Sequence, residues 1–382
     1  MTKLLINIRK AGLILFLVTA GALTGYAAAD LPLVNTQTVG LGGTDTLSIS
    51  YGSGEVILRE SGTGDLMVKE YMKTDQPRYY ANISRSGGTV TIKPGRRSWF
   101  NWFWEARMEL YLPPSFRENI RISNSSGSFR AETDLLDYKT IDINVGSGSV
   151  SLNRLSAKTL SIRVSSGDLD IRGAGGNSFI SLSSGRLQIN ELSGQEHRLK
   201  TSSGRMRIDT LQGNSVLELS SGGIVIDGLT GNADMEIKSG TLQITGLTGT
   251  AHRFRSSSGR TIIEKARGRI DGEISSGSLS IENFSGEGSF GLNSGNAALD
   301  MEELTGDLRF RLSSGRVVLN IPRGTSFNLD AVTNSGRVQV TEAGNETAQV
   351  SGNSTVLRSF GPSPDRTIYA RTSSGNITIN RR

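Results

Sequence analysis

A tripeptide, Ser-Ser-Gly or a close variant, recurs every 18 to 21 residues through two thirds of this chain. A repeat this short cannot bury its own apolar face, so successive copies must stack into a solenoid. The repeat therefore constrains the fold far more than it constrains the function. The predicted structural corner glycines are Gly127, Gly148, Gly167, Gly185, Gly204, Gly222, Gly240, Gly259, Gly277, Gly295, Gly315, Gly336 and Gly375.

Each repeat carries two stretches with the alternation of a half-buried strand. After each glycine the second and fourth residues are apolar, as Leu187 and Ile189 are, and polar residues lie between them. Such alternation indicates a strand with one buried face. A second strand precedes the next Ser-Ser-Gly, and a Leu-x-Gly sequence such as 211–213 separates the two strands. Glycine suits both corners because it reaches positive φ without a Cβ clash.

Equivalent strands of successive coils should pair in parallel, about 4.8 Å apart. None of the eight prolines lies between residues 115 and 321, where every amide is needed for strand pairing. The sequence therefore predicts an all-β fold, a parallel β-helix or solenoid of about thirteen coils. We expect a right-handed coil because parallel crossovers are right-handed, and a cross-section of either two or three sides.

The chain divides into three segments. In residues 1–29 a basic head precedes an apolar stretch and three alanines, which predicts a secretory signal peptide cleaved after Ala29. The alternative for this segment is an uncleaved membrane anchor. Tyr26 stands where a lipoprotein would carry its cysteine, so we expect no lipid anchor. Residues 30–126 should form a β-rich N-terminal cap and the first coils. Residues 127–382 should form the repeat coils, with a degenerate coil at about 341–371 and a closing strand at 376–379.

Charge and cysteine content exclude several kinds of chemistry. The formal charge of +6 includes three cations of the signal peptide, and without them 39 basic residues stand against 36 acidic ones. This balance gives no case for nucleic-acid binding. The chain has no cysteine, which excludes thiolate metal sites and a cysteine nucleophile. One column of arginines follows the corner glycines, and we interpret it as a solvated face: Arg186, Arg205, Arg260, Arg316 and Arg337.

Two other features resemble active-site motifs without the required context. His197 and His252 each lie twelve residues after a corner glycine, three coils apart, which is too far for one metal ion or one catalytic dyad. We interpret both as surface histidines. Residues 286–291 match the dinucleotide-binding pattern Gly-x-Gly-x-x-Gly, but no helix is expected after them. We therefore predict no catalytic residues, no metal site and no cofactor.

An aromatic and basic loop at residues 96–107 holds all three tryptophans of the chain. We expect it either to fold back over the end of the core as a cap, or to contact a membrane interface, a protein or a sugar. The candidate contact residues are Arg96, Arg97, Trp99, Phe100, Trp102, Phe103, Trp104 and Arg107.

Several of these features together resemble the bacterial adhesin-like family of β-strand-repeat proteins, which is carried as a domain of unknown function. The features are the signal peptide, the aromatic and basic insertion at 96–104, the sequence Leu-Tyr-Leu-Pro at 110–113, and the serial Ser-Ser-Gly coils that end at 372–379. The resemblance implies a β-helical protein of the cell envelope or a secreted one. Some relatives are tied to envelope-stress sensing. It supplies no catalytic residues.

The function that these observations favour is a non-enzymatic, exported scaffold or adhesin-like protein that binds an unidentified protein, glycan or membrane surface. A carbohydrate-active β-helix enzyme is the main alternative, and it would need a cluster of carboxylates. A self-assembling envelope protein, or an envelope-stress sensor, is the second alternative. The uniform coil suits a homo-oligomer.

Overall fold

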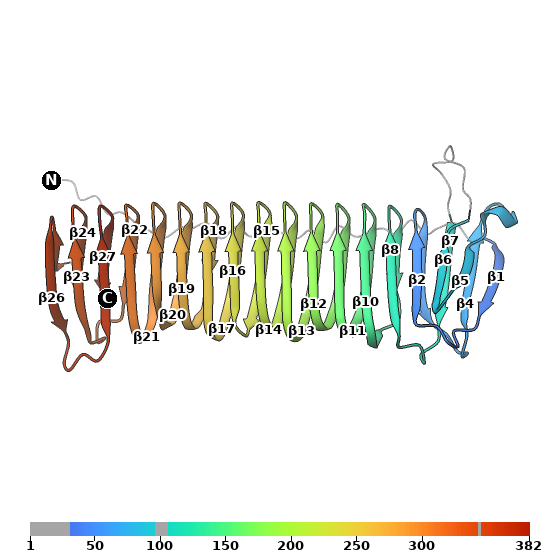
Figure 1. The fold of residues 1–382 in the computed structure, drawn as a ribbon, viewed down its shortest axis with the longest axis horizontal. Coiled ribbons are helices and arrows are strands. Elements are labelled where there is room, and N and C mark those ends of the chain that lie inside the picture. The colour runs from blue at the N-terminus through green and yellow to red at the C-terminus, as the bar shows by residue number, and fades with distance from the viewer. Residues whose placement is uncertain (1–30, 96–105, 343–344) are drawn as a thin grey trace, which may run out of the picture.

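The computed structural model describes residues 31–95, 106–342 and 345–382. Within these residues the chain forms a long rod of β-strands (Figure 1). One short 3-10 helix, η1 (Pro77–Tyr79), lies at the end of the rod where the described chain begins. The expected signal peptide, residues 1–29, lies outside the described residues. No helix in the described part of the chain is long and apolar enough to cross a membrane.

The strands fall into three groups along the rod. At the first end are β1 (Leu33–Val39), β2 (Thr46–Tyr51), β3 (Glu55–Glu60), β4 (Leu66–Met72), β5 (Asn82–Ser86), β6 (Thr89–Lys93) and β7 (Ala106–Leu112). The middle of the rod contains β8 (Asn119–Asn124), β9 (Ser128–Ala131), β10 (Leu135–Val145), β11 (Ser149–Val164), β12 (Asp168–Leu182), β13 (Arg186–Thr201), β14 (Arg205–Leu219), β15 (Gly223–Thr230), β16 (Ala233–Ile237), β17 (Thr241–Ser256), β18 (Arg260–Ile263), β19 (Ala266–Ile274), β20 (Ser278–Leu292), β21 (Asn296–Leu312) and β22 (Arg316–Ile321). The second end contains β23 (Phe327–Thr333), β24 (Arg337–Glu342), β25 (Asn345–Ser351), β26 (Ser354–Phe360), β27 (Thr367–Thr372) and β28 (Asn376–Arg381).

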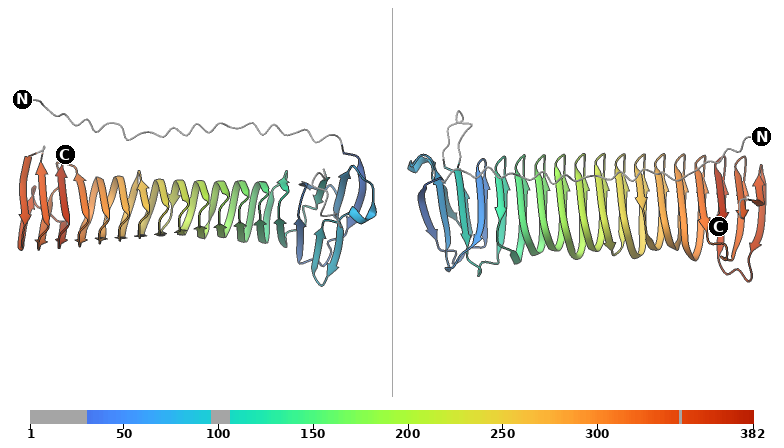
Figure 2. Two further views of the ribbon diagram at one scale, coloured as in Figure 1. Left: turned by 90° about the horizontal axis from the view of Figure 1, so that it is seen from above. Right: turned by 180° about the vertical axis from the view of Figure 1, so that it is seen from behind.

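The predicted solenoid is confirmed, with about 11 turns instead of about thirteen. In the middle of the rod each coil pairs in parallel with the next, as β12 does with β13 and β13 with β14. Each coil has two faces. We call the strands that follow a Ser-Ser-Gly corner the leading face, and those that precede the next corner the trailing face. Many strands run through the Leu-x-Gly corner, so one strand contributes to both faces. Figure 2 shows the two layers from above.

The outermost coils do not follow sequence order. The 367–381 coil, β27 and β28, pairs on one side with β21 and β22 and on the other with β23 and β24. The coil that comes last in the described chain is therefore seated inside the rod, one place from its end, and does not close it as expected. The first end has the same arrangement, because β2 pairs with both β6 and β8, and β3 with both β7 and β9.

Antiparallel strands cover both ends of the rod. At the first end β5 pairs with β6, β4 with β7, and β1 with β4. At the second end β25 pairs with β24, and β26 with β23. The interval expected to hold a degenerate coil thus holds two strands, β25 and β26, which pair antiparallel with β24 and β23. Such strands cover edges that would otherwise pair with another molecule.

The core follows the predicted columns. Leu187, Ile189 and Leu199 are fully buried, as are their counterparts in neighbouring coils. Aromatic residues belong to the core near β20 and β21, where Phe290 and Phe310 stack with ring centroids 5.6 Å apart. The buried face that the apolar alternation predicts is therefore confirmed.

The two kinds of corner need glycine for different reasons. At the Leu-x-Gly corner Gly213 has φ +130°, which is the predicted reason. The Ser-Ser-Gly glycines do not lie in that region, so the positive φ assigned to them is wrong. They are required because successive corners stack closely: a Cβ on Gly222 would lie 2.1 Å from the carbonyl oxygen of Gly204. The corner serines continue the backbone pairing, and the amide of Ser203 donates to the carbonyl of Ser183 at 2.7 Å.

Candidate functional site

Most of the candidate contact residues in the aromatic loop, Arg96 to Trp104, lie outside the described residues. Arg107 lies in β7, where its guanidinium is placed over the ring of Tyr71 at 4.4 Å and its Nε is 3.5 Å from Glu109. Burial, together with the neighbouring Glu109 carboxylate, raises the pKa of the Tyr71 phenol. Arg107 is thus engaged within the sheet at the first end of the rod.

The two histidines are buried, not on the surface as predicted. Both side chains are 2% exposed and belong to one inward-facing column. His197 Nε2 lies 2.8 Å from the carbonyl oxygen of Gln212, and His252 Nε2 lies 3.3 Å from that of Arg267. Each ring therefore donates to the carbonyl of the residue directly before a corner glycine of the following coil, Gly213 or Gly268. Burial lowers the pKa of both imidazoles, which favours the neutral form.

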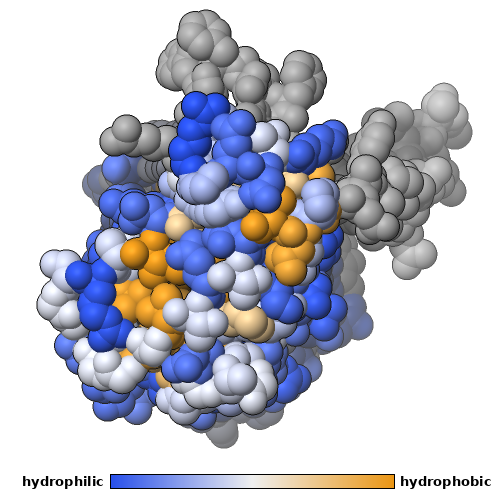
Figure 3. All heavy atoms as spheres, turned by 90° about the vertical axis from the view of Figure 1, so that its right-hand side faces the viewer, coloured by the Kyte–Doolittle hydropathy of each residue, from blue (hydrophilic) through white to orange (hydrophobic). Residues whose placement is uncertain are grey.

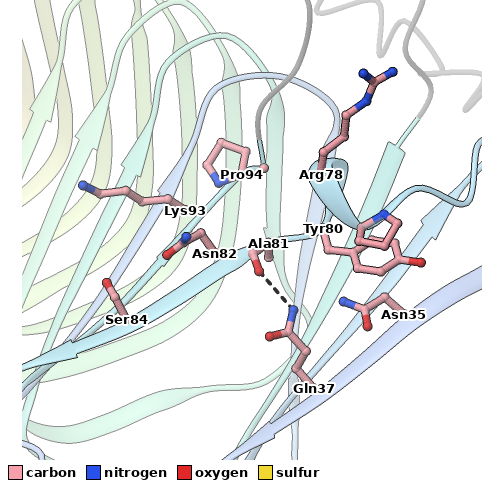
Figure 4. A pocket seen from close by; sticks show the side chains of 11 residues that line it. Asn35, Gln37, Arg78, Tyr80, Ala81, Asn82, Ser84, Lys93 and Pro94 are labelled. Carbon is pink, nitrogen blue, oxygen red and sulfur yellow. Dashed lines mark hydrogen bonds between the residues drawn. The ribbon is translucent and has the colours of Figure 1, made fainter.

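A pocket of about 740 Å³ lies at the first end of the rod. Four segments meet there: β1, η1 with the residues after it, β5, and the end of β6. Its lining residues are Asn35, Gln37, Pro77, Arg78, Tyr80, Ala81, Asn82, Ser84, Lys93, Pro94 and Gly95. Figure 4 shows Asn82, Ser84 and Lys93 on one side and Tyr80 and Asn35 on the other. Because this end is built from cap strands, the pocket has no counterpart in the repeat coils.

A buried carboxylate that is not itself part of the lining anchors two lining residues, Asn35 and Ala81. Glu70 on β4 is 2% exposed, and both of its oxygens accept the backbone amide of Ala81, at 2.8 and 2.9 Å. It also accepts a hydrogen bond from Asn35 Nδ2 at 2.8 Å. Gln37 Nε2 donates to the carbonyl of Ala81 at 3.0 Å. These contacts fix Asn35 and Gln37 while leaving one side-chain oxygen of each as an acceptor.

Close backbone packing shapes the wall formed by η1. A Cβ on Gly95 would lie 2.4 Å from the carbonyl carbon of Tyr79 and from the carbonyl oxygen of Tyr80, so only glycine fits there. The guanidinium of Arg78 lies over the ring of Tyr79, 4.6 Å from its centroid. Tyr80 donates its hydroxyl to Asp75, and this hydrogen bond raises the pKa of the Tyr80 phenol.

The remaining polar groups of the pocket are available to a ligand. Among the described residues, the side chains of Asn82, Ser84 and Lys93 have no partner. The lining includes two cations, Arg78 and Lys93, and no carboxylate. The pocket can therefore donate and accept hydrogen bonds and favours a neutral or anionic ligand. Figure 3 shows this end face, where apolar side chains gather between polar ones.

A second hollow, of about 710 Å³, runs along the trailing face beside both histidines. Three of its charged groups have partners within the chain: Asp234 lies 3.5 Å from Arg255, Asp271 lies 2.9 Å from Arg269, and Arg198 pairs with Glu218. Glu196 and Arg253 make no ion pair among the described residues. Val216, 39% exposed, is its main exposed apolar side chain. Because its lining contains carboxylates as well as cations, it attracts an anionic ligand less than the end pocket does.

Sequence reasoning did not find the end pocket, because its residues form no motif and come from four separated segments. No group of three or more histidine, aspartate or glutamate side chains that could hold a metal ion occurs in residues 31–95, 106–342 and 345–382. The dinucleotide-like residues 286–291 lie within strand β20, with no helix after them.

Several solved structures are similar to this chain at low identity. A candidate cell adhesion protein from Clostridium sporogenes is 10% identical, with 91% of this chain and 98% of that chain covered and a TM-score of 0.22. A candidate adhesin from Parabacteroides distasonis is 12% identical, covering 75% and 94% with a TM-score of 0.24. A candidate lipid-binding protein from the same organism is 16% identical, covering 72% and 96% with a TM-score of 0.22.

No curated protein matches the chain. The sequence profile of a family described as Toastrack DUF4097, a family of unknown function, matches residues 44–227 and 270–380. These two ranges cover more than half of the chain and include nearly all of its coils, so the predicted membership of a β-strand-repeat family of unknown function is confirmed. The chain belongs to the Toastrack DUF4097 family.

Proposed function

We propose that this protein is an exported, non-catalytic binding rod of the cell envelope, and that the pocket at its first end holds a polar ligand. The observation that carries the proposal is the set of unpartnered amide, hydroxyl and ammonium groups of Asn82, Ser84 and Lys93 in a pocket at one tip of the rod. The solenoid then acts as a spacer that holds the pocket away from the rest of the molecule.

The ligand class that fits this chemistry is a hydroxyl-rich carbohydrate, neutral or anionic. Amide side chains both donate to and accept from sugar hydroxyls, and the Tyr80 ring offers an apolar face. Arg78 and Lys93 add attraction for an acidic sugar. Export rests on the signal-peptide features of residues 1–29.

The binding test uses the chain from Asp30 onward and a panel of envelope glycans, with affinity measured by calorimetry. We expect Lys93→Gln and Asn82→Ala each to weaken binding several-fold. Lys158→Gln, an exposed lysine on the middle of the rod, is the matched control and should leave the affinity unchanged. Equal affinities for all three variants, or no binding to any glycan, would contradict the proposed site.

The carbohydrate-active enzyme remains a separate alternative, and the same ligands test it. Glycoside hydrolysis uses a pair of carboxyl groups facing one bond. No carboxylate lines the described end pocket. We therefore expect binding without release of new reducing ends during long incubation.

A further inference from the structure

The leading face carries three parallel columns of outward side chains between the coils that begin at Gly223 and Arg316. The strand register aligns them from coil to coil. The first column is Gly223, Thr241, Arg260, Ser278, Asn296 and Arg316. The middle column is Val225, Gln243, Ile262, Ser280, Ala298 and Val318. The last column is Asp227, Thr245, Glu264, Glu282, Asp300 and Asn320.

These columns differ in charge. Every charged residue of the first column is a cation, every charged residue of the last column is an anion, and the middle column is uncharged. Many of the side chains are small, so the face is flat, and Figure 2 shows a nearly straight rod. Flat sheet faces with a partly apolar centre can stack about 10 Å apart.

Several of the charges have no ionic partner within the chain. Asp227 and Asp300 pair with Arg207 and Arg382. Arg260, Arg316, Glu264 and Glu282 make no ion pair among the described residues, and Glu264 has only a 3.5 Å hydrogen bond from Gln243. Arg260 begins strand β18 and Glu264 directly follows its end, four residues further on and roughly 13 Å away at strand spacing.

We propose that the leading face between Gly223 and Asn320 binds the same face of a second copy of this chain, with the two rods parallel. A two-fold axis along the rod reverses the strand direction and keeps each coil opposite its own copy. The first column then faces the last column of the partner, so Arg260 meets Glu264 of the same coil. Glu282 lies one coil away, about 4.8 Å along the rod. The uncharged middle columns meet each other on the axis.

The charge pattern favours a dimer with parallel rods over one with antiparallel rods. An axis along the strands would place the last column against itself, which brings the acidic residues Asp227, Glu264, Glu282 and Asp300 together. Like charges facing each other disfavour an interface. The parallel sense instead leaves no like-charged pair in any of these coils.

The contact is small. Six coils by five residues give a patch of about 30 by 15 Å, or roughly 900 Å² buried over both copies. This is at the low end for a specific interface, so the association is weak and depends on concentration. Toward the first end, Arg207 and Asp170 would each face their own copies across the axis, which limits the contact to these coils.

The parallel arrangement of the rods would affect ligand binding, and this consequence rests on the proposed function of the end pocket. It places the two end pockets at the same tip of the dimer, so that two ligands on one surface are engaged together and the apparent affinity rises. The dimer itself is measured without ligand, so its failure and a failure of the pocket are distinguishable.

Cross-linking through introduced cysteines tests the parallel dimer. Each introduced cysteine is the only thiol of its chain, because the sequence has no cysteine. Val225→Cys, Ile262→Cys and Val318→Cys would each face their own copy in the parallel dimer. A bis-maleimide that spans the ~10 Å between packed sheets should therefore link all three. Val216→Cys, exposed on the trailing face, is the matched control and should stay monomeric. A link between Val225→Cys and Val318→Cys chains in a mixture, without the self-links, would show antiparallel rods and overturn the proposal.

Exchanging the charges of Arg260 and Glu264 tests whether ion pairs hold the two copies together. Arg260→Glu and Glu264→Arg should each weaken self-association by about tenfold or more, measured by analytical ultracentrifugation over a concentration series. The double variant carrying both changes restores complementarity and should recover the association. If the double variant is as weak as the singles, or if the unaltered chain stays monomeric and its cysteine variants behave like the Val216→Cys control, the face has no such partner.

Discussion

The Oγ atom of Ser178 lies 2.8 Å from Nδ1 of His197, and both side chains are buried. His252 occupies the same column three coils further on, but the residue paired with it is Ala233, so its Nδ1 has no partner. In the following coil His197 is paired with Ser215 and His252 with Ile270. The chain thus contains one buried imidazole whose two nitrogens both have partners and one whose Nδ1 has none.

Supplying the missing hydroxyl should stabilise the rod. We expect Ala233→Ser to raise the free energy of unfolding by about 0.5–1.5 kcal/mol, because a buried acceptor gains a donor. Ser178→Ala should lower it by about 1–3 kcal/mol, because it leaves His197 Nδ1 unpaired. Chemical denaturation of the three proteins measures both changes. Shifts of the same sign in the two variants would show that the hydroxyl is not the cause.

The buried histidines should make stability depend on pH just below neutrality. Burial lowers the pKa of His197 and His252 below the usual 6.5, so the unfolded chain binds more protons than the folded one in that range. Stability is therefore complete above pH 6.5 and falls as the pH drops from 6.5 toward the folded-state pKa. Thermal midpoints between pH 7.5 and 5.5 measure the slope, above the range where ordinary carboxylates titrate.

Removing the imidazoles should remove that slope. A variant with His197→Asn and His252→Asn is expected to be less stable at pH 7.5 yet to lose less on acidification than the unaltered protein. An unchanged slope would assign the pH dependence to other groups.

Adjacent glycines at one corner should respond differently to the same substitution. Gly222→Ala places a Cβ 2.1 Å from the carbonyl oxygen of Gly204, while a Cβ on Gly223 comes no closer than 3.9 Å to a neighbouring atom. We expect Gly222→Ala to lower the thermal midpoint by several degrees. Gly223→Ala should be neutral or slightly stabilising, because it restricts the unfolded chain. Equal effects would mean that the corners do not stack as described.

The seated coil at 367–381 should stabilise residues that precede it in sequence. A chain ending at residue 366 leaves β23 and β24 without their parallel neighbours β27 and β28. We expect amide hydrogen exchange throughout 327–360 to approach that of unfolded peptide, while the middle of the rod stays protected. Retained protection over 327–360 would mean that β23 and β24 pair directly with β21 and β22.

The coil was predictable from the sequence because its causes are local. Alternation gives the buried face of each strand, as at Leu187 and Ile189, and the corner sequence gives the bend. The same alternation also predicts that His197 is buried. It lies two residues before buried Leu199 and therefore on the same side of the strand. The prediction failed there because histidine was judged by its polarity and not by its place in the alternation.

The order of the outer coils could not be predicted in this way. The copies around Gly336 and Gly375 carry the same corner pattern, so either one fits next to β22 as far as local sequence is concerned. The two copies differ in a tertiary relationship, because only β23 and β24 pair with the antiparallel strands β26 and β25. The end pocket was missed for a related reason, since Asn35, Tyr80 and Lys93 are brought together by cap strands that lie outside the repeat.

The seated coil also sets an order of events for a chain that is synthesised from its N-terminus. Residues 327–342 emerge before residues 367–381, yet their final place is beyond them. Until the later segment is present, residues 327–342 lack their parallel neighbours β27 and β28. This end of the rod should therefore form later than the middle and should be open to proteases in the interval.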